Sequence, residues 1–223
     1  MARMTAQDIV DEVRLTLGGE TTETLSDNQI LRWVNRSYID LASAYPFNEL
    51  EESTTLTTSS GTAEYETTVS DMFEVVSLID DTNNVQMYPW QRWQYDRATQ
   101  GDSTNVTGTP VYWFISGVGS NNRRNFTLYP TPAGTYTINI VYQKKPTELV
   151  LTPSATTSVL LECWDEVIIL LAVSRGWRAL GDDDKSYKAK LSANDASKIA
   201  ERSSFTSSYV PMTPGSVVGG ALR

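Results

Sequence analysis

The order of sequence patterns constrains the fold of this chain more than any other feature. Residues 53–143 show strand patterns, whereas the stretches before and after them show helical periodicity. Clusters of Gly, Asn, Ser and Pro divide the middle stretch into short runs rich in β-branched and aromatic residues, which predict strands. The predicted strands are residues 72–79, 111–116, 126–129 and 135–143.

The last of these strands has the clearest pattern. Every second residue from Tyr136 to Tyr142 is aromatic or Ile, which is typical of an antiparallel strand with one buried face. Residues 126–136 predict a hairpin, in which Pro130 and Pro132 end the ladder before the turn. Residues 89–97 predict a single helix inside the β region.

Two helices are expected before the β region. Thr5 followed by Asp8 forms a capping-box-like start, and Gly18 with Gly19 ends the helix. Ser26 with Gln29 is a stronger start signal for a second helix. That helix runs to about residue 44, because Pro46 stops it.

Two more helices are expected after the β region. Residues 160–173 are apolar almost all round, which predicts a helix in a core or between subunits. Gly181 ends it, and residues 182–184 cap the next helix with three Asp side chains. That helix extends to about Phe205 and carries a stripe of small residues suited to close packing: Ala189, Ala193, Ala196 and Ala200.

The last segment, residues 206–223, has a different composition. It contains Pro and Gly, scattered Val and a single charged side chain, Arg223. Such a segment cannot build a core of its own, so we expect an extended tail that is disordered or ordered only on a partner. Its apolar side chains favour docking on a neighbouring protein over service as a solvated linker.

Composition excludes several classes of chemistry. The chain has no His and one Cys among its 223 residues, which excludes His-based triads, His-ligated metals and disulfide frameworks. Cys163 is expected to be a buried small hydrophobe. The net charge is -9, and all of it arises in residues 1–150, because residues 151–223 carry 8 basic and 8 acidic side chains. This balance argues against a DNA-binding packaging factor that grips phosphates.

Targeting and cofactor signals are also lacking in the sequence. The longest apolar run, Val167–Val173, is far too short to span a membrane, and the first residues lack the apolar core of a signal peptide. We therefore expect a protein made in a cytoplasm that has no contact with a membrane. No cofactor motif is present, so we expect no cofactor and no metal.

The candidate chemical motifs each have a structural interpretation beside the functional one. Asp165 and Glu166 are adjacent on a helix, so their side chains point about 100° apart and are expected to flank its apolar face. The three Asp side chains at 182–184 are explained by capping of the following helix, and a metal site is the alternative. The two basic pairs, at 123–124 and 144–145, are expected to be solvated charges.

The aromatic residues of the β region allow a second functional hypothesis. Planar rings could form a sugar-binding platform, or they could fill the core and contacts of a small sheet. Glu64 and Glu66 flank Tyr65 on one face of a predicted strand and could converge as acid and base. The alternative function is thus a carbohydrate-binding or glycan-cleaving β module with helical flanks. The aromatic residues are Trp90, Trp93, Tyr95, Tyr112, Trp113 and Tyr129.

These patterns predict an α+β fold. Residues 1–50 and 146–205 form a helical body, residues 51–145 form an inserted antiparallel β module, and residues 206–223 form an extended tail.

The order of these parts resembles that of the head-to-tail connector adaptors of tailed double-stranded DNA bacteriophages, also called head completion or tail accessory proteins. The resemblance covers nearly the whole chain and is weakest over residues 51–108. No single motif is specific, but their order and spacing are. The matching segments are TAQDIVDEVR at 5–14, LSDNQILRWVNRSYIDLA at 25–42, FTLYPTPAG at 126–134, VYQKKPTEL at 141–149, ECWDEVIILLA at 162–172 and KSYKAKL at 185–191.

The resemblance implies a non-enzymatic structural protein of the virion, assembled in the host cytoplasm. It implies a homo-oligomer, a dodecameric ring that docks beneath the portal protein, extends the DNA channel and receives the next tail or nozzle protein on its far side. Genomic DNA would pass through without specific binding, which suits an acidic wall.

The same resemblance assigns roles to two groups of residues. The C-terminal tail would bind the portal, and the apolar helix with the alanine stripe would pack within and between subunits. The expected portal-binding residues are Phe205, Tyr209, Val210, Pro211, Met212, Pro214, Val217, Val218, Leu222 and Arg223. The expected subunit-packing residues are Trp164, Ile168, Leu171, Ala189, Ala193 and Ala196.

Overall fold

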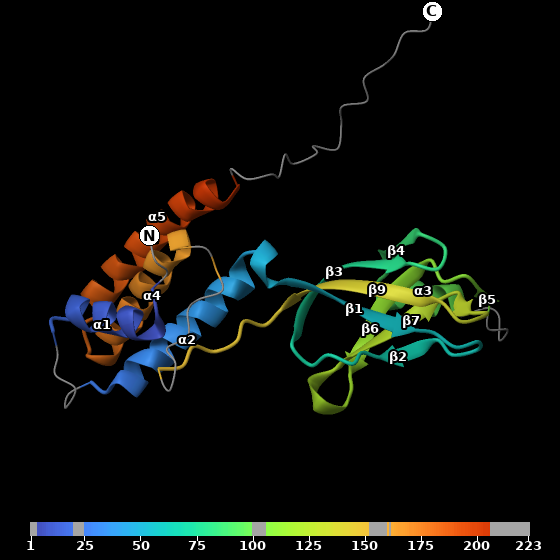
Figure 1. Ribbon diagram of the computed structural model, residues 1–223, viewed down its shortest axis with the longest axis horizontal. Coiled ribbons are helices and arrows are strands. Elements are labelled where there is room, and N and C mark those ends of the chain that lie inside the picture. Colours follow the sequence, from blue (N-terminus) through green and yellow to red (C-terminus); the bar gives the residue numbers. More distant parts are fainter. Residues whose placement is uncertain (1–3, 20–24, 100–105, 152–159, 161, 206–223) are drawn as a thin grey trace, which may run out of the picture. The chain divides into compact units, whose positions relative to one another are not determined.

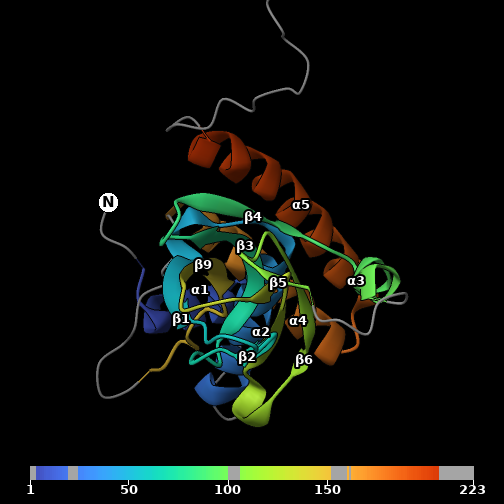
Figure 2. The ribbon, with the colours of Figure 1, turned by 90° about the vertical axis from the view of Figure 1, so that its right-hand side faces the viewer.

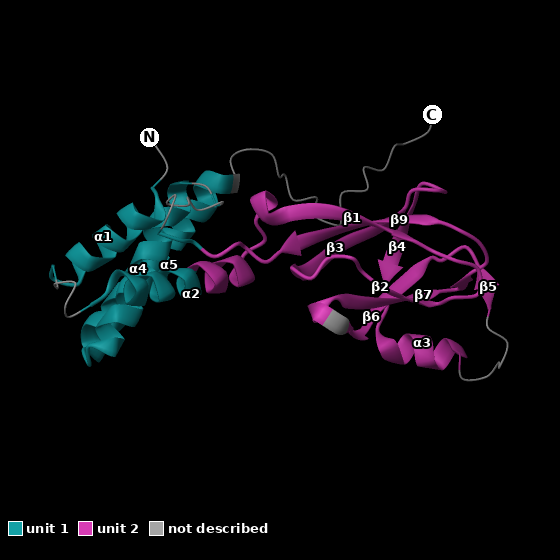
Figure 3. Cartoon of the chain, turned by 60° about the horizontal axis from the view of Figure 1, so that its bottom comes forward, with its two compact units in different colours: residues 1–37, 149–223 teal, residues 38–148 magenta. Residues whose placement is uncertain are grey.

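The structure, a computed structural model, describes residues 4–19, 25–99, 106–151, 160 and 162–205. The chain divides into two compact units, which are coloured separately in Figure 3. Residues 1–37 with 149–223 form the helical unit, and residues 38–148 form the sheet unit. The sequence placed the boundaries at residues 50 and 146, and that division stays a prediction. The α+β class predicted from the sequence is confirmed.

The helical unit contains the helices expected from both ends of the sequence (Figure 1). Two come from the N-terminal part, and the second of them continues past residue 37 into the sheet unit. Two come from the C-terminal part, preceded by a short 3₁₀ turn. The elements are α1 (Ala6–Thr16), α2 (Asp27–Ala44), η3 (Glu162–Trp164), α4 (Asp165–Ala179) and α5 (Asp183–Phe205).

The predicted helix starts and stops are confirmed. Thr5 and Asp8 form a complete capping box: the Asp8 backbone N–H donates to Thr5 Oγ1, and the Thr5 backbone N–H donates to the Asp8 carboxylate. Gly18 and Gly19 both have positive φ, a conformation that glycine adopts without strain, and they end α1. Ser26 Oγ accepts from the backbone N–H of Gln29 at the start of α2.

The core of the helical unit is formed by one face each of α1, α2 and α4. α4 packs closely against the end of α1 at Gly176, where a Cβ atom would lie 2.7 Å from Leu17 Cδ1 and 3.2 Å from Trp33 Cζ3. Glycine therefore permits this close approach. The fully buried core side chains include Ile9, Val10, Val13, Ile30, Val34, Ile168 and Ala172.

Two polar side chains, Arg14 and Asn35, attach other parts of the chain to α2. Arg14 in α1 forms an ion pair with Asp27 and donates from Nη1 to the Leu25 carbonyl, at 2.6 Å. The Asn35 amide makes two hydrogen bonds with the backbone of Leu149, of 3.0 and 2.8 Å. The returning chain is thereby attached to α2 where it re-enters the helical unit.

The sheet unit is built on a seven-stranded sheet with the order β1-β9-β3-β4-β6-β7-β2. Most pairings are antiparallel, as expected, but β4 pairs with β6 in parallel, and so do two short strands, β5 and β8. The elements are η1 (Asn48–Leu50), β1 (Glu51–Thr57), β2 (Glu64–Glu66), β3 (Met72–Asp80), β4 (Val85–Pro89), α3 (Arg92–Thr99), β5 (Thr107–Gly108), β6 (Tyr112–Val118), η2 (Ser120–Asn122), β7 (Arg124–Tyr129), β8 (Thr131–Pro132) and β9 (Thr137–Lys144).

The strand with the clearest alternation, β9, lies inside this sheet, antiparallel to both β1 and β3. Its alternating side chains Ile138, Ile140 and Tyr142 are buried. They join one core with side chains from both halves of the sheet. Figure 2 shows the course of the strands that contribute to it. The other buried members are Leu56, Met72, Leu78, Met87, Trp113, Phe126 and Leu128.

The predicted hairpin at residues 126–136 is wrong. β7 pairs with β6 and β2, whereas β9 pairs with β1 and β3, so the two strands are not neighbours in the sheet. The proline segment between them is held by other parts of the chain: β8 pairs with β5, and Pro132 accepts from the Gly61 N–H. Residues 130–136 therefore connect two separate regions of the sheet instead of forming a tight turn.

Candidate functional site

The expected portal-binding residues lie almost entirely outside the described residues. Residues 209–223 have no described position. Phe205 is the last residue of α5, and its side chain is not described. The portal-binding role of the tail therefore stays a prediction.

The expected subunit-packing residues are placed by the structure in α4, η3 and α5. Trp164, Ile168 and Ala193 are at most 2% exposed in the single chain, so contacts within the helical unit already cover them. Leu171 and Ala189 are half-buried, as is Ala196. Contacts of these residues with a second copy stay a prediction.

The alanine stripe faces α4. Ala193 and Ala200 are each 1% exposed, and Ser174 Oγ in α4 donates to the Ser186 carbonyl in α5 at 2.9 Å. The small side chains let the two helices come close enough for this buried hydrogen bond. Cys163 is half-buried beside Ala200, with its Sγ atom 3.9 Å from the Ala200 carbonyl oxygen.

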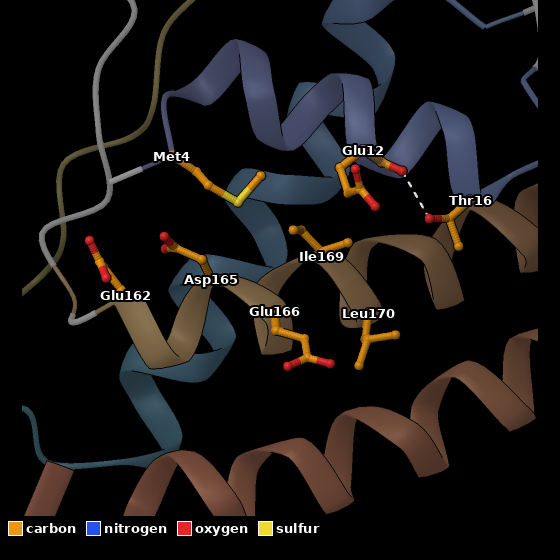
Figure 4. A pocket seen from close by; sticks show the side chains of 8 residues that line it. All are labelled: Met4, Glu12, Thr16, Glu162, Asp165, Glu166, Ile169 and Leu170. Carbon is orange, nitrogen blue, oxygen red and sulfur yellow. Dashed lines mark hydrogen bonds between the residues drawn. The ribbon is translucent and has the colours of Figure 1, made fainter. Parts of the chain in front are cut away.

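A groove with a cavity volume of about 470 Å³ lies between α1 and α4 (Figure 4). We call it the α1–α4 groove. Met4, Ile169 and Leu170 provide its apolar lining, and Thr16 adds a hydroxyl that donates to the Glu12 carbonyl at 2.9 Å. In the part of the chain that the structure describes, its charged lining residues are Glu12, Glu162, Asp165 and Glu166.

The carboxylates of this groove differ in burial. Asp165 is 5% exposed, whereas Glu12, Glu162 and Glu166 are exposed. Asp165 and Glu166 occupy the first turn of α4, where the helix dipole favours negative charge. The sequence predicted that this pair flanks an apolar face; Glu166 is exposed, whereas Asp165 is buried together with Val167, Ile168 and Ile169. The groove itself was not predicted.

A second hollow, of about 510 Å³, lies on the outer surface of α5 near the end of α4. We call it the α5 face. Tyr187 is 64% exposed and Leu191 45% exposed there. The remaining lining residues are polar or charged, and they are Arg178, Asp183, Ser186, Lys190 and Asn194.

The residues at 182–184 act as a helix cap. The Lys185 backbone N–H donates to Asp182 Oδ1 at 2.9 Å, and Lys185 Nζ lies 3.0 Å from Asp182 Oδ2. Both bonds, the backbone one most strongly, lower the pKa of Asp182 below its ordinary value. Lys185 also lies over the Trp177 ring, 4.1 Å from its centroid. In the described part of the chain, no group of three or more acidic or Cys side chains could hold a metal ion.

The aromatic residues of the sheet unit contact one another. Trp90 stacks on Tyr112 with ring centroids 4.1 Å apart, and it also stacks on Tyr129 at 5.2 Å. Tyr95 meets Tyr129 edge to face at 5.9 Å. Trp113 is 7% exposed in the core. The rings of these residues therefore hold α3 and the strands together, and of the six expected platform residues it is Trp93 that is largely exposed, at 60%.

The two carboxylates of the glycan hypothesis lie on β2. Glu64 accepts from Ser116 Oγ at 2.7 Å and lines a cavity of about 310 Å³ together with Arg92, Tyr95 and Asp96. Glu66 is not among the lining residues of that cavity. Its Oε1 atom instead lies 2.8 Å from where a Cβ on Gly119 would be. The expected convergence of Glu64 and Glu66 in one catalytic cleft is not seen.

The predicted basic pairs have structural contacts. Arg124 Nη2 donates to the Phe73 carbonyl at 3.3 Å. Lys144 forms an ion pair with Glu52, and this contact lowers the pKa of the Glu52 carboxyl. Tyr142, beside Glu52, has its pKa raised to about 12, first by burial and then by the nearby negative charges.

The described helices include none that is long and apolar enough to cross a membrane. No curated protein matches the chain. A family model described as SU10 adaptor protein matches residues 4–215, which include both units and most of the tail. The chain therefore belongs to the SU10 adaptor protein family, and it is a structural adaptor of a phage and a component of the virion.

Proposed function

We propose that this adaptor assembles into a ring beneath the portal of its phage, extends the DNA channel and receives the next tail component on its far side. The observation that carries the proposal is the family match over residues 4–215. An adaptor must present one surface to the portal, one to the next component and one to its own copies. The ring is expected to be a dodecamer, and the role requires no catalytic group.

The charge of the chain supports passage of DNA without binding. The net charge is -9, and residues 1–150 carry 19 acidic and 10 basic side chains. A channel wall of this sign repels phosphates, so it does not retain the genome as it moves.

The composition of the C-terminal tail supports portal docking. Among residues 206–223, Arg223 is the one charged side chain, and Val, Met, Tyr and Leu are spread between Pro and Gly. An extended apolar segment binds by filling grooves or by adding to a sheet edge of a partner. We therefore propose that this tail is the segment that binds the portal.

Removal of the tail tests the assignment. The full chain, a variant ending at Phe205, and a full-length variant with Tyr209, Val210, Val217 and Val218 changed to Ser are mixed with purified portal. Co-sedimentation measures binding, and negative-stain images show whether rings form. We expect both variants to keep the helical circular dichroism of the full chain and to lose stable binding. Portal binding equal to that of the full chain in both variants would show that the tail is not the docking element.

A further inference from the structure

We propose that successive copies of the adaptor join head to tail, with the α5 face of one copy seated in the α1–α4 groove of the next. The inference rests on the ring assembly proposed above and names the surfaces that would build it. Both surfaces belong to the helical unit, so one compact body would carry the whole ring contact.

A ring needs this kind of pairing. A two-fold dimer uses one self-complementary patch, whereas a closed ring of more than two copies needs two different patches that fit each other. The helical unit presents two such patches. The α1–α4 groove is a hollow with acidic side chains, whereas on the α5 face a large aromatic side chain, Tyr187, stands 64% exposed beside a second hollow.

The charges of the two surfaces are complementary. Among the described residues, four carboxylates and no basic side chain line the α1–α4 groove. The α5 face has two cations, Arg178 and Lys190, against one carboxylate, Asp183. Two acidic grooves placed against each other would repel. Electrostatics therefore favours contact between the groove of one copy and the α5 face of the next, and this contact gives the assembly a direction.

The apolar parts of the two surfaces also match. Tyr187 and Leu191 lie one helical turn apart on α5, and they are 64% and 45% exposed. Tyrosine is enriched among residues that dominate binding energy, because it combines a large apolar area with a polar end. Met4 and Leu170 are half-buried in the groove and would contact the aromatic side chain of Tyr187 from the neighbouring copy.

The alanine stripe on the opposite side of α5 is a weaker candidate for the same role. Ala193 and Ala200 are already covered within one chain. The outward side of α5 instead keeps apolar side chains uncovered, because Tyr187 is 64% and Leu191 45% exposed there. A second copy would therefore bind the outward side of α5.

A charge-swap experiment tests the pairing. The groove variant carries Glu162→Lys and Glu166→Lys, and the face variant carries Arg178→Glu and Lys190→Glu; all four side chains are exposed, so both variants are expected to fold. Self-association is measured by sedimentation velocity, and rings are imaged with and without portal. Each variant alone should associate at least about tenfold more weakly than the unmodified chain, because two attractions become repulsions.

The mixture of the two variants is the decisive sample. In an alternating assembly each altered groove meets an altered face and each unaltered groove meets an unaltered face, so association should return to within about threefold of the unmodified chain. Matched controls reverse exposed charges in the sheet unit: Glu148→Lys with Asp81→Lys, and Lys145→Glu with Arg97→Glu. These controls should associate as the unmodified chain does.

Three results would overturn the inference. If the unmodified chain forms rings and each variant alone does so equally well, the ring stands but these surfaces do not build it. If the variants associate normally yet lose portal binding, the surfaces receive the portal. If the unmodified chain forms no ring with or without portal, the ring assembly itself is wrong.

Discussion

Replacing Ala193 by Leu tests whether the alanine stripe is closed inside one chain. Ala193 is 1% exposed on the side of α5 that faces α4, so an isobutyl group has no room there. Overpacking of a tight core costs about 1–3 kcal/mol. The value should lie at the upper end, because the bond from Ser174 to the Ser186 carbonyl holds the helices close. Loss of that bond would add about 1 kcal/mol.

The measurement is urea unfolding followed by circular dichroism at a wavelength dominated by helix. We expect Ala193→Leu to lower the free energy of unfolding of the helical unit by about 2–4 kcal/mol. Ser192→Leu, one position away on the exposed surface, is the matched control and should stay within about 0.5 kcal/mol of the unmodified chain. Equal stability of the two variants would refute the reasoning, and it would return the stripe to the surfaces available for a second copy.

Two further predictions concern pH. Lys185 holds the pKa of Asp182 below its ordinary 3.8, so the charged carboxylate stabilises the fold above that pH and its contribution is lost as the pH falls. Urea unfolding measures the difference in stability between the unmodified chain and Asp182→Asn. This difference should shrink below pH 3.8. Tyr142 has its pKa raised from 10.0 to about 12, so its neutral form stabilises the fold below pH 10.0 and that contribution is lost between pH 10.0 and about 12. Tyr142→Phe has no phenol to ionise, so it should lose less stability across that range, and an equal loss in both proteins would contradict this.

The helix ends could be predicted because their signals are local. The Thr5 and Asp8 capping box closes within four residues, and Gly18 and Gly19 adopt the positive φ that ends α1. Strand β9 was equally clear, since its alternating side chains Ile138, Ile140 and Tyr142 are buried in one core. By contrast, β1 and β4 each bury a single side chain, Leu56 and Met87, so neither produces an alternating pattern.

The wrong hairpin and the surfaces of the helical unit depend on contacts between distant parts of the chain, which local sequence patterns do not reveal. Residues 126–136 have the composition of a turn, but which strands pair depends on partners up to about 80 residues away. The α1–α4 groove joins Met4 to Leu170, and helical periodicity shows which side of a helix is apolar without showing which helix will cover it. The alanine stripe was predicted to pack closely, and its partner, α4, became visible only in the structure.

The division of the chain has a consequence for the order of folding during synthesis. The sheet unit is one continuous stretch, residues 38–148, whereas the helical unit is interrupted by it. α1 and α2 leave the ribosome first, but α4, against which α1 packs, follows more than 100 residues later. The bonds between Asn35 and Leu149 span 114 residues in the same way. Pairing over such separations is slow, so the sheet unit is complete before the helical unit can close. The surfaces proposed to build the ring are therefore the last to form, and a nascent copy cannot join a neighbour until its own chain is finished.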